Sequence, residues 1–242
     1  MKYYQFFVAA VALLLITSSL TAAPLWQSNE IFLLHGKGYE VNSDKQSVMT
    51  LEHASGWSFG DVFAFVDINK YHHSNESTDY YGEISPRLSY NKLSNNKING
   101  TLQDILLATT LEFGKGDVEG LLLGVGFDFK FPGFNYVNVN IYRRFINTER
   151  DGETIQITPA WSLNFSQNVS FEGYADWNIT SDDNYKENFH FNPRLKYTIP
   201  VLSNKAAIGL EYSYWKNKYG IKSSSAFKTD QEAISLFISL IL

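Results

Sequence analysis

The chain has 242 residues and a formal net charge of −5, and 44% of its residues are hydrophobic, 16% aromatic and 19% charged. The acidic balance argues against binding of a nucleic acid polymer, whose phosphates attract basic surfaces. The absence of cysteine excludes disulfides and thiolate metal sites.

The first segment, residues 1–23, is predicted to be a secretory signal peptide. Lys2 precedes an apolar stretch from Phe6 to Ile16, and small residues that end at Ala22 and Ala23 follow it. An uncleaved membrane anchor is the alternative, but the apolar run is shorter than the roughly 20 residues that a spanning helix needs. The mature chain is therefore expected to comprise residues 24–242 as one domain.

Most of this mature chain alternates between apolar and polar residues with a period of two, which is typical of β-strands with two different faces. The clearest segments cover residues 61–69, 136–145, 154–165, 170–177 and 189–197, and similar segments begin near residues 29, 48, 80, 102, 121 and 207. Polar, turn-like stretches such as residues 74–77, 94–97 and 182–184 separate them. About twelve strands are expected.

The last predicted strand has one aliphatic face that runs to residue 242, formed by Ile234, Leu236, Ile238, Leu240 and Leu242. A terminal amphipathic strand of this kind is typical of outer-membrane barrels, in which it closes the ring against the first strand. Leu242 takes the place of the aromatic residue that usually ends such a strand.

These features predict an all-β fold, a transmembrane antiparallel β-barrel of about twelve strands closed by the C-terminal strand. A closed sheet satisfies all of its backbone groups within a bilayer, and about twelve strands with short turns fit the length of the mature chain. A soluble β-sandwich would also alternate. Long segments, ionisable residues on the opposite face and flanking aromatics such as Trp161 and Trp177 favour the barrel.

If the aliphatic face meets lipid, the other face lines a lumen. The predicted substrate-binding residues on that face are Asp61, Phe63, Phe65, Asp67, Glu83, Arg87, Asn140, Tyr142, Tyr174, Asp176, Arg194 and Trp215. Aromatic rings can stack on nucleobases at about 1–3 kcal/mol per base, and polar side chains can bond base edges and ribose hydroxyls. The alternative is that the rings fill a narrow barrel while the charges pair with one another.

Two neighbouring segments resemble the Tsx family of nucleoside-specific channels, including its OmpK relatives. Phe63-Ala64-Phe65-Val66-Asp67 matches the pattern aromatic-x-aromatic-x-Asp, and Glu83-Ile84-Ser85-Pro86-Arg87-Leu88-Ser89, with Lys92-Leu93 after it, matches Glu-x-x-Pro-Arg-x-Ser and Lys-Leu. The segment 124–128 and the strand with Asn138, Asn140 and Tyr142 look like the family's central hairpin.

The resemblance implies a twelve-stranded monomeric barrel with a narrow nucleoside channel, in which Phe63, Phe65, Asp67, Glu83 and Arg87 occupy motif positions. Phe stands at positions 63 and 65 where the family usually has Tyr. Some members are phage or colicin receptors. The expected partners are nucleosides as permeating solutes, outer-membrane lipid, the barrel-assembly machinery and phage or colicin, with no cofactor and no metal.

Three other functions compete with a nucleoside-selective channel. A small non-selective porin and a plugged structural or receptor barrel share the same fold. An outer-membrane enzyme would need a triad such as Ser89, His190 and Asp176, which no local motif supports, so the chain is not expected to be an enzyme. His72 and His73 are expected to be a solvated pair, and the Gly-rich stretch 114–120 a loop.

Overall fold

The computed structural model describes residues 23–72, 78–116, 118–146, 153–179, 185–203 and 205–242. Residues 1–22 of the predicted signal peptide lie outside this range, so the prediction stays open. Within the described residues, none of the helices has the length and hydropathy to cross a bilayer.

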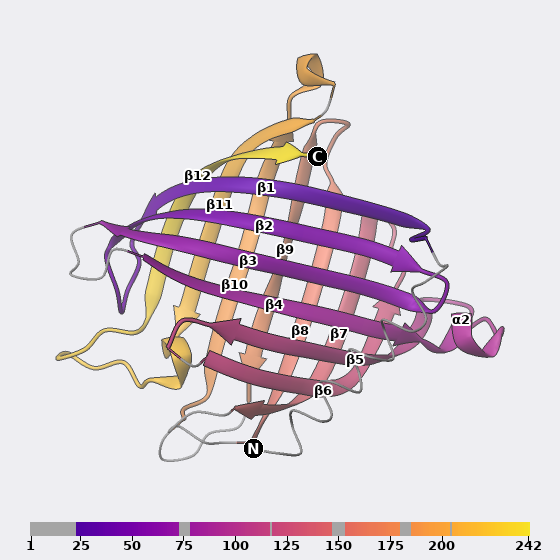
Figure 1. The fold of residues 1–242 in the computed structure, drawn as a ribbon, viewed down its shortest axis with the longest axis horizontal. Coiled ribbons are helices and arrows are strands. Elements are labelled where there is room, and N and C mark those ends of the chain that lie inside the picture. Colours follow the sequence, from indigo (N-terminus) through magenta and orange to yellow (C-terminus); the bar gives the residue numbers. More distant parts are fainter. Residues whose placement is uncertain (1–22, 73–77, 117, 147–152, 180–184, 204) are drawn as a thin grey trace.

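Twelve strands form the fold (Figure 1). Their bounds are β1 Trp26–Lys37, β2 Lys45–Trp57, β3 Gly60–His72, β4 Thr78–Ser89, β5 Leu102–Gly114, β6 Val118–Phe129, β7 Phe134–Ile146, β8 Glu153–Asn164, β9 Val169–Asn178, β10 Asn188–Thr198, β11 Ala206–Lys216 and β12 Gln231–Ile241. Short helices α2 (Tyr90–Ser94), η1 (Pro200–Leu202) and η2 (Lys218–Gly220) lie in the connections.

Each strand pairs antiparallel with its neighbours in the chain, and β12 pairs with β1 to close the barrel. The closing register runs from Glu30 opposite Ile241 to Lys37 opposite Ile234. Beyond it, the Leu242 amide donates to the Asn29 carbonyl over 3.0 Å. The predicted closed antiparallel barrel is confirmed, with the C-terminal strand as its closing element.

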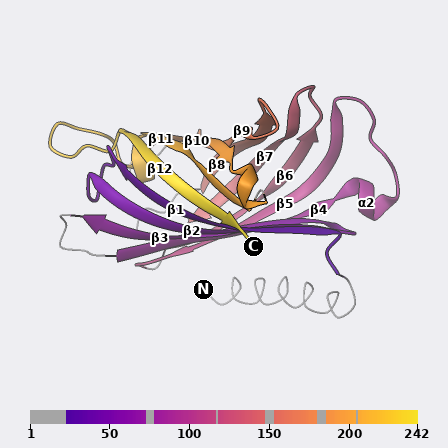
Figure 2. The same cartoon turned by 90° about the horizontal axis from the view of Figure 1, so that it is seen from above.

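The barrel is flattened. In Figure 1, β1 to β6 lie across the front while β7 to β12 pass behind them at a steep angle, and Figure 2 shows the two halves facing each other around the lumen. We call the end at which β1 begins and β12 finishes the terminal end; α2 and η1 belong to it. The opposite end, with η2 and the β1–β2 connection, is the loop end.

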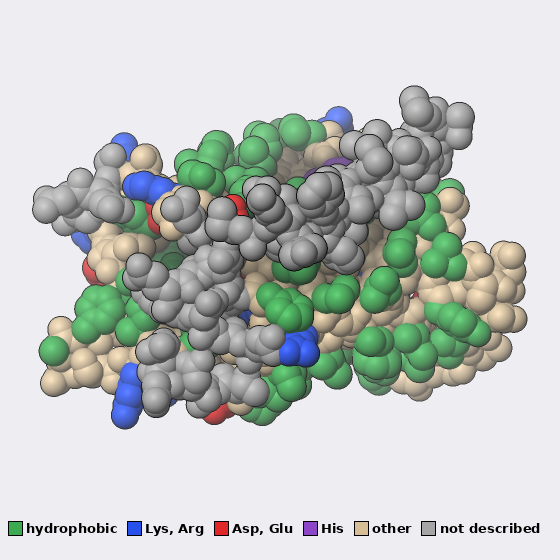
Figure 3. All heavy atoms as spheres, turned by 60° about the horizontal axis from the view of Figure 1, so that its bottom comes forward, with side chains coloured by type: hydrophobic (Ala, Val, Ile, Leu, Met, Phe, Trp, Pro, Cys, Tyr) green, Lys and Arg blue, Asp and Glu red, His purple; other side chains and the backbone are tan. Residues whose placement is uncertain are grey.

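The outer face is apolar because alternate strand residues point away from the lumen. In β12 the exposed fraction of Leu236 is 68%, whereas that of the neighbouring Ser235 is 2%. Ile234, Ile238 and Leu240 are exposed like Leu236, which confirms the outward face predicted for this strand. Figure 3 shows hydrophobic side chains spread over the outer surface with few charged ones between them, as a lipid-facing surface requires.

Apolar side chains also fill two parts of the interior, which the alternation did not predict. Phe32, Leu34 and Phe237 are buried together near the β1–β12 seam. A second cluster on the β5–β7 wall joins Ala108 and Leu122 to a tyrosine of β7. These clusters narrow the lumen, although twelve strands would otherwise leave an open passage.

At the terminal end, α2 interrupts the β4–β5 connection that the sequence predicted to be a turn. The Ser89 hydroxyl caps the helix by accepting a hydrogen bond from the Lys92 amide. The Lys92 ammonium in turn donates to the carbonyls of Trp57 and Gly60, each over 2.8 Å. These bonds hold the helix against the β2–β3 turn.

Candidate functional site

The β3–β4 hairpin brings the two motif segments together on the inner face. Its register places Asp61 opposite Arg87 and Phe65 opposite Glu83. The Arg87 guanidinium binds both carboxylate oxygens of Asp61, with Nε–Oδ1 and Nη2–Oδ2 distances of 2.8 and 2.9 Å, and its Nη1 lies 2.9 Å from Asp128 Oδ1. This bidentate pair fixes the guanidinium plane.

Three aromatic rings from this hairpin form a continuous inner surface, which we call the aromatic ladder: Phe63, Phe65 and Tyr81. The ring centroids of Phe63 and Phe65 lie 6.1 Å apart, and those of Phe65 and Tyr81 lie 6.0 Å apart. Phe63 is 41% exposed although it points inward, so its ring is open to lumenal solvent. The ladder therefore offers an apolar, flat surface inside the barrel.

Carboxylates and a hydroxyl lie next to the ladder. The Tyr81 hydroxyl lies 2.7 Å from Glu83 Oε1 and 3.0 Å from Glu112 Oε1. Asp67 accepts a 2.6 Å hydrogen bond from the Thr50 hydroxyl of β2. A planar solute on the rings would thus meet hydrogen-bond acceptors at its edge.

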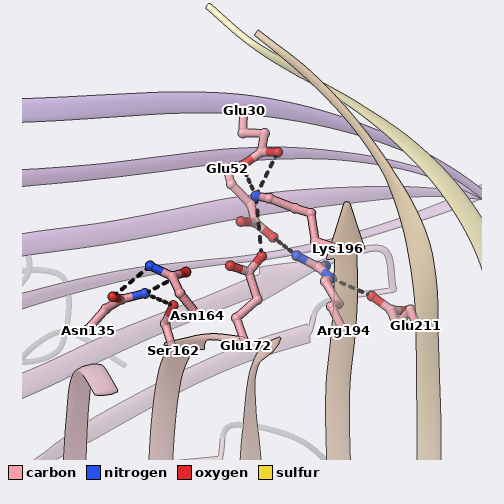
Figure 4. A network of polar contacts seen from close by, with 9 residues as sticks. All are labelled: Glu30, Glu52, Asn135, Ser162, Asn164, Glu172, Arg194, Lys196 and Glu211. Carbon is pink, nitrogen blue, oxygen red and sulfur yellow. Dashed lines mark hydrogen bonds and ion pairs between the residues drawn. The ribbon is translucent and has the colours of Figure 1, made fainter. Parts of the chain in front are cut away.

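A larger ion-pair network crosses the lumen near the seam (Figure 4). Arg194 of β10 binds Glu52 of β2 and Glu211 of β11, and its guanidinium carbon lies 4.3 Å from the centroid of the Phe32 ring. Two residues further along β10, Lys196 binds Glu30 and Glu172, with shortest N–O distances of 2.9 and 3.5 Å. The network joins five strands across the flattened barrel.

A third network lies toward the loop end. The Arg144 guanidinium Nη2 lies 2.7 and 2.9 Å from the two oxygens of Glu112, and Nη1 donates to the Tyr185 hydroxyl over 2.7 Å. Tyr185 belongs to the β9–β10 connection and is buried. Tyr185 is therefore anchored by a buried cation.

The remaining predicted residues have different surroundings. The Trp215 ring stacks on His190 with centroids 4.0 Å apart, and the Tyr174 ring meets His190 edge-on at 5.4 Å. Asp176 accepts a 2.6 Å hydrogen bond from the Thr158 hydroxyl. Tyr142 is packed against the β5–β6 wall, where it acts as filler, with its hydroxyl 3.4 Å from Thr110 Oγ1.

All twelve predicted residues therefore point inward, but they do not form one site. Asp61, Phe63, Phe65, Asp67, Glu83 and Arg87 lie together on β3 and β4, whereas Arg194 and Trp215 belong to the β10–β11 wall. The alternative interpretation, in which rings fill the barrel and charges pair with one another, also has support. Arg87 and Arg194 form ion pairs with carboxylates, and Tyr142 is packed in a buried cluster. Whether any of the twelve binds solute stays a prediction.

The triad considered for an enzyme is not assembled. Ser89 Oγ donates to Asp104 at the terminal end, His190 bonds Ser213, and Asp176 binds Thr158 and Gln156. Of the two histidines expected to form a solvated pair, the structure describes only His72, which is half-buried. His72 ends β3, its Nε2 lies 2.9 Å from Ser47 Oγ, and its ring meets that of His35.

Sequence reasoning missed the carboxylates that pair with the lumenal cations on β10 and β7, namely Glu30, Glu52 and Glu112. Their strands also alternate, and Glu52 follows Thr50 on the inner face of β2. The alternation was less visible in β1 because its inward positions include Phe32 and Leu34, which resemble lipid-facing residues. No cluster of three or more potential metal ligands occurs among the residues that the structure describes.

At the loop end, η2 covers part of the mouth. Lys218 is buried, and its ammonium donates to Gln231 Oε1 over 2.6 Å and to the Glu40 carbonyl over 3.3 Å. The next residue, Tyr219, places its ring 5.7 Å from that of Trp215. Burial lowers the pKa of the Lys218 ammonium to about 7, although Glu40 opposes the shift.

This burial predicts that η2 is held more firmly at high pH. Between pH 7 and the ordinary lysine pKa, the opened segment binds more protons than the closed one, so closure gains free energy as the pH rises. Hydrogen exchange of the Lys218 and Gly220 amides, corrected for intrinsic rates, should be slower at pH 9 than at pH 6. Replacing Lys218 by Met should abolish the difference; an unchanged pH response in that variant would contradict the assignment.

Comparison with known proteins identifies one family that matches nearly the whole barrel. The family model described as "Nucleoside-specific channel-forming protein, Tsx" matches residues 26–240. Outer membrane protein OmpK of Vibrio parahaemolyticus is 25% identical over 175 residues, which are 67% of this chain and 66% of the relative, just under two thirds of its length. OmpK of strain RIMD 2210633 of that species is 26% identical over 188 residues, 70% of each chain.

Among solved structures, the KdgM porin superposes with a TM-score of 0.54 at 10% sequence identity. The match covers 87% of this chain and 98% of the porin. At this identity the likeness shows the outer-membrane barrel fold and says nothing about the solute.

Proposed function

Because the chain belongs to the Tsx family of channel-forming outer-membrane proteins, we propose that its lumen conducts nucleosides by passive, substrate-selective diffusion. The family is one of channels and not of enzymes, and its OmpK relatives are outer-membrane proteins. The aromatic ladder carries the proposal. Its rings supply stacking faces for a base, while Asp67 and Glu83 supply acceptors for amino groups and ribose hydroxyls.

In this proposal the other residues have supporting roles. Arg87 and Asp61 hold the β3–β4 wall, and Arg194 with its carboxylates holds the opposite wall, so the passage keeps a fixed width. Tyr174, Asp176 and Asn140 offer further weak contacts, and Trp215 with Tyr142 shapes the walls. A series of weak sites suits conduction because binding must help entry without preventing exit.

The proposal also includes those sequence predictions that the structure does not test. Residues 1–23 are removed as a signal peptide, the barrel-assembly machinery inserts the mature chain as a monomer, and phage or colicin use it as a receptor.

Replacing Phe63 by Ala should reduce nucleoside flux about fivefold, because one lost stacking contact is worth about 1 kcal/mol or more. Liposome swelling with thymidine, compared with a sugar of similar mass, measures this flux. Phe165→Ala is the matched control, since that ring is 64% exposed on the outer side of the β8–β9 turn. Equal swelling rates for thymidine and the sugar in the unmodified protein would instead indicate a non-selective porin.

A further inference from the structure

The inward-facing strand positions carry a large surplus of negative charge. Twelve carboxylates point inward, namely Glu30, Glu52, Asp61, Asp67, Asp79, Glu83, Asp104, Glu112, Asp128, Glu172, Asp176 and Glu211, against four cations, Arg87, Arg144, Arg194 and Lys196. Both signs are present on the inner face, but the count across all twelve strands is unequal.

The ion pairs leave some of these carboxylates without a cation. The four cations bind seven carboxylates, which are Asp61, Asp128, Glu112, Glu52, Glu211, Glu30 and Glu172. The other five receive neutral donors: Asp67 from Thr50, Asp79 from Tyr71, Glu83 from Tyr81, Asp104 from Ser89, and Asp176 from Thr158 and Gln156. Among the described residues, no Lys or Arg is in ion-pair contact with these five.

Three of the five come from both halves of the flattened barrel, and we call Asp67, Glu83 and Asp176 the carboxylate zone. Asp67 and Glu83 come from β3 and β4, whereas Asp176 comes from β9 in the opposite half of the flattened barrel. The zone therefore contributes carboxylates to both walls of the lumen.

A second observation points to a ligand that brings positive charge or donors. Asn140 is only 8% exposed, and its Oδ1 has no hydrogen-bond partner. Asn140 lies opposite Thr158 in the β7–β8 register, and Thr158 is the residue that bonds Asp176. The oxygen lies beside Gly126 of β6, where a Cβ atom would fall 2.5 Å from it. The lumen wall therefore also holds a buried acceptor without a donor.

We propose that the carboxylate zone makes the lumen selective for cations, so that small monovalent cations and protonated amines permeate in preference to anions. Rings of Asp and Glu select cations in channels because the passage focuses their field and its low-dielectric walls screen it poorly. The proposed preference for cations over anions does not depend on the proposed nucleoside function. Only the consequence of this preference for nucleosides that carry amino groups rests on that function.

Reversal potentials in planar bilayers under a KCl gradient test the proposal without any nucleoside. The permeability ratio of K⁺ to Cl⁻ should be on the order of 10. Asp67→Asn, Glu83→Gln and Asp176→Asn combined should lower it severalfold, while Asp230→Asn, whose residue pairs with the outward Lys216 at the loop end, should leave it unchanged. Heat-modifiable mobility checks that each barrel is folded.

A ratio at or below one in the unmodified protein, or an unchanged ratio in the folded triple variant, would overturn the proposal. If the triple variant does not assemble, the three single variants carry the test, each with a smaller decrease. Loss of thymidine preference in swelling assays with an intact K⁺ preference would reject the nucleoside function alone.

Discussion

Replacing Leu236 by Arg should lower the free energy of unfolding in a lipid bilayer by about 2–4 kcal/mol. Leu236 lies in the middle of β12 and is 68% exposed on the outer face, between Ile234 and Ile238 on the same side. A guanidinium there must lie among acyl chains near the midplane, where it loses its hydration. Urea titration of the protein in phospholipid vesicles, followed by tryptophan fluorescence, measures the loss.

Val201→Arg is the matched control, because Val201 is exposed in η1 at the terminal end, outside the strands. It should unfold at the same urea concentration as the unmodified protein. Equal stability of the Leu236 and Val201 variants would mean that the outer face of β12 does not meet lipid, and the orientation of every strand would need revision.

Replacing Arg194 by Met should cost about 3–5 kcal/mol, because it leaves buried carboxylates without their cation. Glu52 and Glu211 both bind this guanidinium, whose side chain is largely buried above the Phe32 ring. The same urea titration measures the loss. Lys216→Met is the control, since Lys216 and Asp230 form an exposed pair outside the lumen, and it should change stability little.

A triple variant distinguishes the loss of the Arg194 ion pairs from the loss of packing around its side chain. Arg194→Met combined with Glu52→Gln and Glu211→Gln removes the unpaired charges while keeping the methionine, so most of the stability should return. If the triple variant is as unstable as Arg194→Met alone, the cost comes from packing around the guanidinium, and the ion pairs do not hold the wall.

The outer face could be predicted from sequence because lipid imposes one simple requirement on every second residue. Ile234, Leu236 and Ile238 meet that requirement regardless of which strand lies beside them. Strand β1 was harder to interpret, since Phe32 and Leu34 are apolar yet lie inside, where the Arg194 guanidinium and Phe237 cover the Phe32 ring. A period of two does not say which of two apolar faces is outside.

The candidate site was predictable only in part. The β3–β4 residues lie on adjacent strands joined by a short connection, so their proximity follows from a hairpin. Arg194 and Glu52 are 142 residues apart, and they meet only because the closed sheet brings β2 and β10 to facing walls. Barrel diameter and flattening decide such contacts, and neither is encoded in any single segment. The surplus of unpaired carboxylates was hidden for the same reason.

The seam between the first and last strands has a consequence for biogenesis. The free edge of β1 cannot acquire its partner until residues 234–241 have been synthesised, because the closing register uses those residues alone. Closure is therefore a late event with very long sequence separation, and such pairings are slow and prone to aggregation when left open. Until β12 arrives, this edge is open to pairing with other copies of the chain, so the topology favours a route that keeps it shielded.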